Sequence, residues 1–384
     1  MTGQEWILCI FILAFGCCIG SFLNVVIYRL PREKSLVRPG SSCPHCGKAI
    51  QFYDNIPLVS WLVLRAKCRY CKVAISPRYF VVELLTGSAF LGLYLLYYHT
   101  GVRPGLQVQG GWFVYSLHLV LVGAFIAASG IDLELWIIPL SICWLVTAVG
   151  VIGSAVGGYL IRPELIQTHG LLPVASARTA ALALGASAGL AIALVLLRTG
   201  LLKRSYDQGE PEDLPAGKAG GTPAKEPEYQ HRLEALKEVV FLLPVILGAL
   251  VAVAVLDRSG AVGQWWCGLV ARPAVAGLFG GVFGYFVGCA VVWATRILGT
   301  LAFGKEAMGL GDVHLMGAAG AVVGPLMVVV AFFVAPFFGL GWAIFQMFFK
   351  KIRQIPYGPF LSLAVLTVMI FQDWIQNRFA MVFL

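Results

Sequence analysis

The stretch WILCIFILAFGCCIGSFLNVVIYRLPREK, residues 6–34, determines the fold class. Its first part, 6–28, carries no charged side chain and exceeds the roughly 20 mostly apolar residues that cross a bilayer as a helix. Similar stretches recur along almost the whole chain, in which 59% of the 384 residues are hydrophobic and 12% are charged. With a mean hydropathy of +0.83, the chain lacks the polar surface that a water-soluble domain needs. We therefore expect an all-α polytopic membrane protein with about 8–10 transmembrane helices in a lipid bilayer.

Positive charge is concentrated in the loop that follows the first predicted span. Residues 29–78 contain ten Lys and Arg residues against Glu33 and Asp54. Because short loops rich in Lys and Arg stay in the cytoplasm, we expect this loop there and the N-terminus outside. A cleaved signal peptide would carry positive charges before its apolar stretch, whereas Gln4 and Glu5 precede this one. The formal charge of +9 comes with no RNA- or DNA-binding motif, so we expect no nucleic-acid partner.

Apolar and polar segments divide the chain into five expected parts. These are a first transmembrane helix at 1–28, a cytoplasmic zinc-binding module at 29–78, transmembrane helices at 79–160, extra apolar segments at 161–270, and further transmembrane helices at 271–384. Within the fourth part, 203–238 is rich in Pro, Gly and mixed charges, which predicts a flexible cytoplasmic loop ending in a polar run, 228–237, that could be helical. Glycines at 277–288 indicate close helix packing. The segment 313–324 is short for a span, and the last segment is expected at 359–383.

Four of the ten cysteines form two CxxC pairs in the basic loop. The first pair is Cys43 and Cys46, and the second is Cys68 and Cys71. Each pair can place two thiolates on one turn, so the two turns supply four soft ligands for a tetrahedral Zn²⁺. Because four thiolates leave no open coordination position, we predict a structural rather than a catalytic zinc. The alternatives are a redox pair or unligated thiols, and His45 could replace one cysteine as a ligand.

Two aspartates stand out, because ionisable groups among apolar segments are scarce and costly. Asp132 lies in ASGIDLELWIIP, 128–139, at the expected cytoplasmic end of a span, and Asp312 lies in MGLGDVHLM, 308–316, at the expected cytoplasmic start of another. Peptide hydrolysis by an aspartate pair needs one carboxylate to activate water and one carboxylic acid to polarise the scissile carbonyl. Asp132 and Asp312 are therefore candidate catalytic residues. The alternative is that both cap helices or pair with Lys or Arg.

Residues beside the aspartates suggest how such a site would be built. Gly309 and Gly311 flank the approach to Asp312, where a missing Cβ would permit a tight turn and a close substrate backbone. Pro139 would break or kink the helix that carries the first aspartate. His314 would be either a third polar member of the site or a residue of the helix surface.

Several motifs occur in a fixed order along the chain. They are GSFLNVVIYRLP at 20–31, YDNIPLVSW at 53–61, ISPRY at 75–79, VELLT at 82–86, Asp132 followed by Ile138 and Pro139, GLGD at 309–312 and PYGPF at 356–360. Together they resemble the motifs of the type IV prepilin peptidases, the prepilin leader peptidase/N-methyltransferase family. The resemblance covers nearly the whole chain outside roughly 160–260.

The resemblance implies an aspartic endopeptidase of the GxGD type in the inner membrane of a bacterium, with Asp132 and Asp312 as catalytic residues. It would cut after a glycine at the cytoplasmic face, between the basic leader and the hydrophobic helix of a prepilin or pseudopilin of a type IV pilus or type II secretion system. Members with the four-cysteine module commonly also methylate the new N-terminal amine with S-adenosylmethionine. Since the chain shows no Rossmann-type glycine fingerprint, methylation rests on the resemblance alone.

The chain departs from the family pattern at three places. His314 stands where family members usually carry lysine, and because histidine titrates near neutrality we hypothesise a shifted pH profile. Ala66 replaces the usual glycine before the second cysteine pair and restricts the backbone there, which argues against methyltransferase activity. The third departure is the insertion of apolar segments and a polar loop at about 160–260.

Two other function classes are compatible with a membrane protein of this composition. A membrane transporter or channel would place acids deep within spans and show internal repeats, and neither is seen in the sequence. A zinc-stabilised, non-catalytic assembly factor of a pilus or secretion system would keep the cysteine module without needing both aspartates. The protease interpretation accounts for both features.

Overall fold

The computed structural model of the chain describes residues 3–107, 109–206, 230–349 and 356–383, and of the side chains at 347–349 and 380–383 nothing is stated. Within these ranges the regular elements are all helical. In chain order they are α1 (Gly3–Arg29), η1 (Leu30–Arg32), η2 (Phe52–Asp54), α2 (Val59–Val63), α3 (Pro77–Tyr98), η3 (Pro104–Gln107), α4 (Gly111–Leu135), α5 (Leu140–Leu160), α6 (Pro163–His169), α7 (Ala177–Arg198), α8 (His231–Arg258), α9 (Gly260–Val270), α10 (Pro273–Phe303), α11 (Leu310–Val323), α12 (Pro325–Phe349), α13 (Gly358–Ile370) and α14 (Gln372–Phe383).

Eight helices of the described part of the chain are long and apolar enough to cross a membrane, namely α1, α3, α4, α5, α7, α8, α10 and α12. A ninth crossing results if the bent pair α13 and α14 is counted as one span. The helix α11 is shorter, with 14 residues and a length of about 21 Å at 1.5 Å per residue. The prediction of an all-α, multi-pass membrane protein with about eight to ten spans is confirmed.

The last predicted segment, 359–383, is not one straight helix. Its two halves, α13 and α14, meet at an angle of 73°. At the bend lies Arg103, a fully buried side chain from the loop between α3 and α4. Its Nη1 donates to the carbonyl of Met369 at 2.7 Å, and its Nε pairs with Asp373 at 2.8 Å. The arginine therefore takes the carbonyl that a continuing helix would offer to the N–H of Asp373, and the helix breaks there.

Close packing of the spans depends on glycines. A Cβ atom on Gly20 of α1 would lie 2.7 Å from the Cα of Glu83 in α3. A Cβ on Gly284 of α10 would lie 2.0 Å from the carbonyl oxygen of Gly320 in α11. Such contacts leave no room for a larger residue, as is common where helices associate in lipid. The glycine-rich segment 277–288 thus packs α10 against its neighbours, as predicted.

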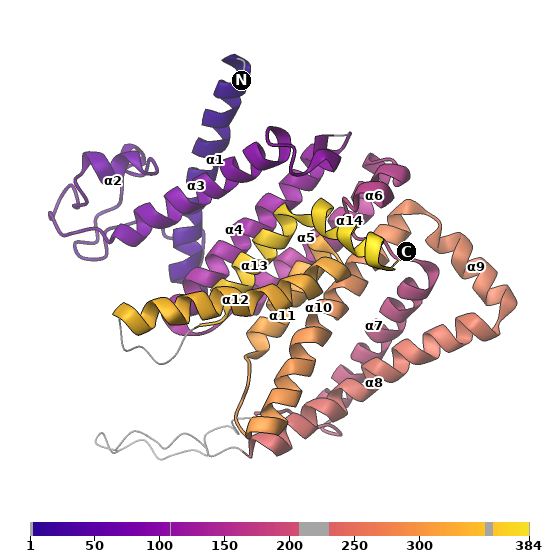
Figure 1. Cartoon of the computed structure of the whole chain (residues 1–384). Helices are drawn as coiled ribbons and strands as arrows, with labels where there is room; N and C mark the ends of the chain where they lie inside the picture. The colour runs from indigo at the N-terminus through magenta and orange to yellow at the C-terminus, as the bar shows by residue number, and fades with distance from the viewer. Residues whose placement is uncertain (1–2, 108, 207–229, 350–355, 384) are drawn as a thin grey trace, which may run out of the picture.

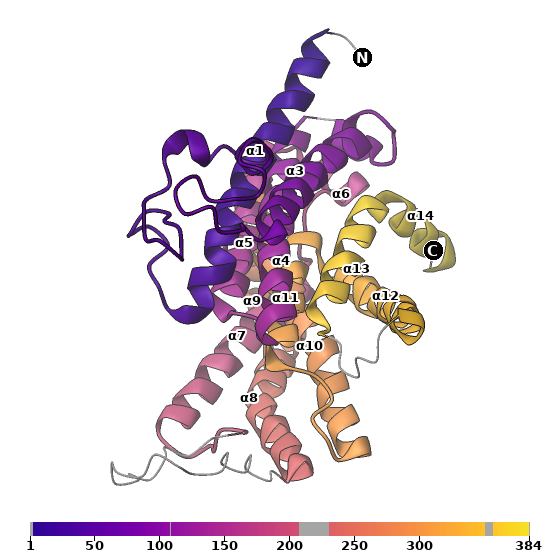
Figure 2. The ribbon, with the colours of Figure 1, turned by 90° about the vertical axis from the view of Figure 1, so that its left-hand side faces the viewer.

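The insertion forms a hairpin of two spans, α7 and α8, which lie side by side and also contact α10 (Figures 1 and 2). A Cβ on Gly189 of α7 would lie 2.1 Å from the carbonyl oxygen of Pro244 in α8. The polar run expected at 228–237 is helical from His231 onward, as the first turns of α8. Most of the predicted flexible loop, residues 207–229, lies outside the described residues.

Between α1 and α3, residues 30–76 form a lobe beside the bundle (Figure 1). The lobe is tied to α3 at two points. The Leu58 N–H donates to the buried carboxylate of Glu83 at 2.8 Å, and the rings of Trp61 and Phe80 lie 5.0 Å apart. These contacts anchor the predicted cysteine module on the bundle.

Candidate active site

Asp132 lies in the last turn of α4, with its side chain 6% exposed. The helix is closed by Trp136, which adopts a left-handed conformation (φ 60°) and donates its N–H to the Asp132 carbonyl at 3.0 Å. The carboxylate oxygen Oδ2 accepts the N–H of Gly358, the first residue of α13, at 3.0 Å. The N-terminus of α13, 226 residues further along the chain, therefore fixes the orientation of the Asp132 carboxylate.

Asp312 is the third residue of α11, and it is 8% exposed. Gly309 precedes the helix as its N-cap, and a Cβ on it would lie 3.4 Å from Oδ2 of Asp312. The negative charge also suits the positive end of the helix dipole.

Contacts through Ile138 bring the two aspartates to the same end of the bundle. The helices that carry them, α4 and α11, are in contact. Ile138, which follows α4, lies between them: a Cβ on Gly311 would be 2.8 Å from the Ile138 Cβ, and a Cβ on Gly358 would be 3.2 Å from its Cδ1. Three segments distant in sequence, at 132–139, 309–312 and 357–358, thus converge on one site.

The glycines before the second aspartate serve close packing rather than a tight turn. Gly309 has φ −73° and ψ 149°, which any residue can adopt, and Gly311 lies within α11. Gly311 instead makes room for Ile138, and a Cβ on Gly309 would lie at ordinary contact distance, 3.4 Å, from the Asp312 carboxylate. Pro139 directly precedes α5, and the helix break predicted there is observed.

His314 follows Asp312 by two residues on α11, and its side chain is half-buried. Its Nδ1 is 2.8 Å from the hydroxyl of Tyr285 on α10, and its ring lies 5.9 Å from that of Trp144 on α5. The imidazole is therefore held by a neutral partner and an aromatic neighbour, next to the site rather than in it.

Two further carboxylates near the aspartates are paired with arginines. Glu134, two residues after the first aspartate, forms an ion pair with Arg78 at the start of α3. Glu306, in the loop before α11, pairs with Arg296 of α10 at 2.6 Å. The first pair also connects the end of the cysteine module to the Asp132 end of α4, so both lie at the same end of the bundle.

The ligand atoms of Cys43, Cys46, Cys68 and Cys71 all lie within 4.8 Å of one another. The Sγ atoms of Cys43 and Cys71 are 3.8 Å apart. A tetrahedron with Zn–S bonds of about 2.3 Å has edges of about 3.8 Å, so this spacing fits a zinc ion. The four cysteines predicted as a group are thus brought together in an arrangement that could hold a metal ion.

The two cysteine turns have the same backbone structure. In each, the residue after the second cysteine adopts a left-handed conformation, with φ 69° at Gly47 and φ 59° at Lys72, and an isolated antiparallel bridge joins the flanking chain. The backbone N–H groups of Cys46 and His45 lower the pKa of Cys43. In the second turn, those of Cys71 and Tyr70 lower the pKa of Cys68 to about 6. Both shifts favour the thiolate, which is the form that binds metal, whereas desolvation and the neighbouring cysteine side chains raise the pKa of Cys71 to about 11.

Three residues around the site and the loop before α11 were not predicted from the sequence. Gly358 donates to Asp132, and the pair formed by Glu238 on α8 and Arg296 on α10 contacts the loop before α11. Arg296 is a charged residue inside an apolar span, which by itself marks a position that needs an explanation. Gly358 lies in the Pro-Tyr-Gly-Pro motif, but no residue type there indicates a contact with an aspartate.

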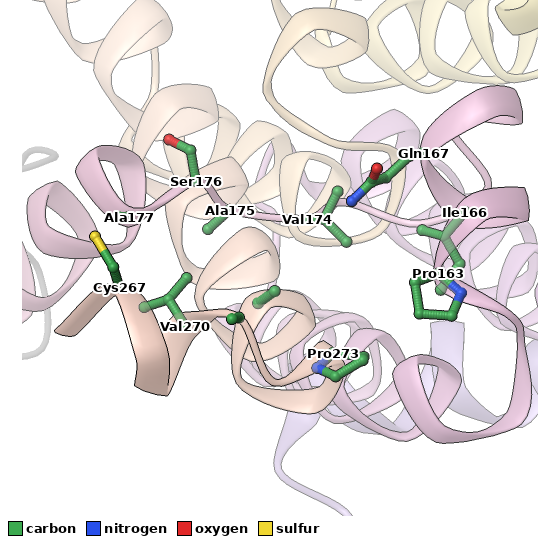
Figure 3. Close-up of a pocket in the computed structure, with 12 residues that line it drawn as sticks. Pro163, Ile166, Gln167, Val174, Ala175, Ser176, Ala177, Cys267, Val270 and Pro273 are labelled. Atoms are coloured by element: carbon green, nitrogen blue, oxygen red, sulfur yellow. The ribbon is translucent and has the colours of Figure 1, made fainter. Parts of the chain in front are cut away.

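A pocket of about 490 Å³ lies elsewhere, between the loops that precede α7 and α10 (Figure 3). Its lining includes Val174, Ser176, Val270 and Pro273, and none of its lining residues is an acid, a base or a histidine. It adjoins the first residue of α10, whereas the aspartates lie near the opposite end of that helix. We therefore do not assign it to catalysis.

Comparison with known proteins finds similar proteins that are named as prepilin-processing enzymes. Residues 14–97 match the family described as Bacterial Peptidase A24 N-terminal domain. The chain is 48% identical over 134 residues to the prepilin leader peptidase/N-methyltransferase of Myxococcus xanthus. Over the aligned residues the chain is similar to the prepilin leader peptidases. No solved structure matches it.

Two other relatives give similar alignments. The identity is 41% over 137 residues with the type 4 prepilin-like proteins leader peptide-processing enzyme of Escherichia coli O78:H11, and 32% over 182 residues with the prepilin leader peptidase/N-methyltransferase of Aeromonas hydrophila. The three alignments cover 34%, 31% and 41% of this chain and 36%, 46% and 59% of the relatives. The chain thus spans about half the length of the curated relatives that it matches.

Proposed function

We propose that the chain is a membrane aspartic endopeptidase that removes the basic leader from type IV prepilins or pseudopilins. The observation that carries this proposal is the convergence of Asp132 and Asp312, two buried carboxyls on the contacting helices α4 and α11, around Ile138. The names of the relatives supply the substrate class.

The chemistry follows from two acids that cannot both ionise easily at short distance. They share one proton, so one carboxylate can take a proton from water while the other, protonated, polarises the carbonyl of the scissile peptide bond. The N–H of Gly358 keeps Asp132 oriented before substrate arrives. A prepilin would place its apolar helix among the spans and its basic leader at the polar membrane surface.

The active site and the cysteine module are proposed to face the cytoplasm, from the inner membrane of a bacterium. In support of this orientation, the loop 29–78 carries ten Lys and Arg residues against two acids. The ion pair of Arg78 with Glu134 ties that loop to the Asp132 end of α4. A substrate leader would meet the site on the side where prepilins are made.

The metal of the cysteine module is proposed to be Zn²⁺, held by Cys43, Cys46, Cys68 and Cys71. Bound there, zinc would cross-link two loops that contain little apolar core of their own. Metal analysis of the purified protein should find about one zinc per chain, since four thiolates complete one tetrahedral site. Replacing Cys43 and Cys68 together by serine should remove it, and retention of a full zinc equivalent would refute the assignment.

The relatives' names suggest N-methylation of the new N-terminus as a second activity, which would consume S-adenosylmethionine. We assign no residue to that cofactor. Transfer of a labelled methyl group to a cleaved prepilin tests this activity separately from cleavage.

The cleavage test uses purified protein in detergent and a synthetic prepilin. Asp132→Asn and Asp312→Asn should each reduce the cleavage rate about 10³-fold or more, because each removes one half of the acid pair. The matched control is Asp257→Asn, which changes an exposed aspartate that pairs with Arg178. The proposal fails if either site variant cuts at the wild-type rate while remaining folded.

A further inference from the structure

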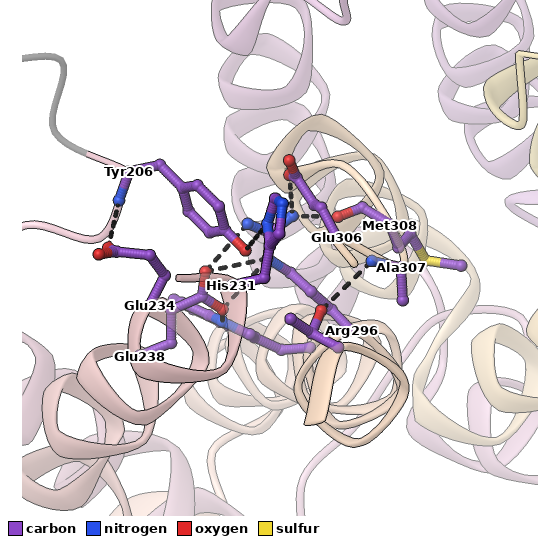
Figure 4. Close-up of polar contacts among 10 residues, drawn as sticks. Tyr206, His231, Glu234, Glu238, Arg296, Glu306, Ala307 and Met308 are labelled. Atoms are coloured by element: carbon purple, nitrogen blue, oxygen red, sulfur yellow. Dashed lines mark hydrogen bonds and ion pairs between the residues drawn. The ribbon is translucent and has the colours of Figure 1, made fainter. Parts of the chain in front are cut away.

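The inserted hairpin contacts the loop that leads to Asp312 through one buried arginine (Figure 4). Arg296 of α10 is 1% exposed. Toward the hairpin, its guanidinium pairs with Glu238 of α8, with Nε 3.0 Å and Nη2 3.0 Å from Oε1. Glu238 is also buried, at 3% exposed, so neither charge has water as an alternative partner.

The opposite edge of the same guanidinium holds the loop before α11. Its Nη1 donates to the carboxylate of Glu306 at 2.6 Å and to the carbonyl of Met308. Met308 directly precedes Gly309, the N-cap of α11, three residues before Asp312. A series of polar contacts therefore runs from α8 through α10 to the loop that leads to the second aspartate.

A contact with α10 also fixes the direction in which Glu238 points. Its Oε2 accepts the indole N–H of Trp293 at 2.7 Å, one turn before the arginine on α10. The ring of Tyr206, which precedes α8 in the chain, covers the guanidinium at 5.2 Å. The Tyr206 N–H in turn donates to Glu234 of α8 at 2.7 Å. Contacts on three sides thus leave the guanidinium one orientation.

We propose that Glu238 and Arg296 are positioning residues, through which the α7–α8 hairpin holds the 306–309 loop so that Asp312 faces Asp132. This inference rests on the proposed peptidase function. A buried ion pair gives little net stability, because desolvation offsets its Coulomb attraction, whereas its fixed geometry orients what it binds. The role of the insertion is therefore to set the active-site loop.

The experiment compares Glu238→Gln with Asp257→Asn in the purified protein. Glu238→Gln removes the charge that orients Arg296 while keeping the size of the side chain. Asp257→Asn removes an exposed carboxylate near the other end of α8, where it pairs with Arg178. We measure kcat and KM for a synthetic prepilin, together with amide hydrogen exchange of the peptide covering 304–312.

For Glu238→Gln we expect kcat to fall about tenfold or more with KM within about threefold, since misplacement of a reacting group affects the chemical step. Exchange in 304–312 should become faster, and exchange in the cysteine module should not change. Asp257→Asn should leave both kcat and the 304–312 exchange within about twofold of wild type. This combination supports the proposal.

Two results would overturn the positioning role. The first is wild-type kcat together with wild-type loop exchange in Glu238→Gln. The second is an equal gain of exchange throughout the protein, which would mean a general stabilising role.

If Glu238→Gln does not fold, Trp293→Phe provides the same test, because it removes the hydrogen bond that orients Glu238 and keeps every charge. It should then lower kcat with faster loop exchange, and unchanged values would refute the idea. If the wild type does not cut prepilin at all, the peptidase function fails, while the exchange measurement still decides the positioning role.

Discussion

At the scale of single residues, Gly358 is the position where one added methyl group should disturb the candidate site. A Cβ there would lie 2.7 Å from Oδ2 of Asp132, too close for an unbonded contact. Gly358→Ala should therefore displace the first aspartate and lower the cleavage rate by roughly 10²-fold, the effect of moving a catalytic group by about 1 Å. Initial rates on a synthetic prepilin measure this.

The control for that substitution is Gly341→Ala in α12, where nothing lies within 4 Å of the added Cβ. This variant should cut at the wild-type rate. If Gly358→Ala also retained full activity, the N–H contact with Asp132 would not be part of the catalytic arrangement.

His314 allows a prediction about pH. Lysine at this position would carry a permanent positive charge two residues from Asp312, whereas histidine is largely neutral above its ordinary pKa of about 6.5. Because a nearby cation favours ionised carboxyls, the pH–rate curve of His314→Lys should move toward lower pH. Tyr285→Phe, which removes the hydrogen bond to His314 without adding charge, should leave the position of the curve unchanged. An unmoved curve in His314→Lys would retire the hypothesis.

The two aspartates could be selected from the sequence because a carboxylate beside an apolar segment is costly and conspicuous. Their partners could not. Gly358 acts through its backbone N–H, which every residue except proline has. Glu238 lies at the edge of a polar run, and its pairing with Arg296 depends on how α8 packs against α10. Residue type reveals an acid, but tertiary packing decides what the acid contacts.

At the scale of elements, the cysteine module contains a strained backbone at the position where the family resemblance leads us to expect glycine. Ala66 and Arg65 both adopt left-handed conformations, with φ 56° and φ 51°. Both backbone polar groups of Ala66 are hydrogen-bonded. Its N–H donates to the carbonyl of Trp61 at 2.8 Å, and its carbonyl accepts the N–H of Ile75 at 2.7 Å. The conformation is therefore required by the module's fold.

Ala66→Gly should stabilise the module by about 1 kcal/mol, because glycine adopts positive φ without the steric cost that a Cβ imposes. Slower release of zinc to a chelator measures this gain. Ala49→Gly, in the first cysteine turn, is the comparison: its φ is not positive, so the change should bring no gain. Equal zinc-release rates for Ala66→Gly and wild type would contradict the explanation.

Element boundaries followed from the sequence where a local cause ended the helix, as at Pro139 before α5. The sequence did not predict a helix boundary where the residue that interrupts the helix is distant in the chain. The break between α13 and α14 comes from Arg103, which lies far away in the chain and takes the Met369 carbonyl. Hydropathy alone therefore predicted one continuous segment at 359–383.

At the scale of the whole molecule, the site requires α11 and α12 each to pass from one end of the bundle to the other. Asp132 lies in the last turn of α4, Asp312 lies in the first turn of α11 and Gly358 begins α13, and all three lie at one end of the bundle. With only 14 residues, α11 still extends far enough for Gly324, just beyond it, to approach Pro173 in the loop before α7. Short length made this helix doubtful as a span in the sequence, and the position of its ends in the bundle argues for a crossing.

This path predicts which loops face which side of the membrane. With the basic lobe 30–76 in the cytoplasm, α3 runs outward, and the loop between α3 and α4 faces the periplasm. Cysteines introduced at Val37, which is 82% exposed, and at Thr100, also exposed, would report the two sides. A membrane-impermeant maleimide added to intact spheroplasts should label Thr100→Cys, and added to inverted vesicles it should label Val37→Cys. Labelling read by mass spectrometry at each site separates these cysteines from the native ones. Modification of Val37→Cys in intact spheroplasts would place the aspartates at the periplasmic face, where the basic leader of a newly made prepilin does not reach, and would remove the basis for leader cleavage by this pair.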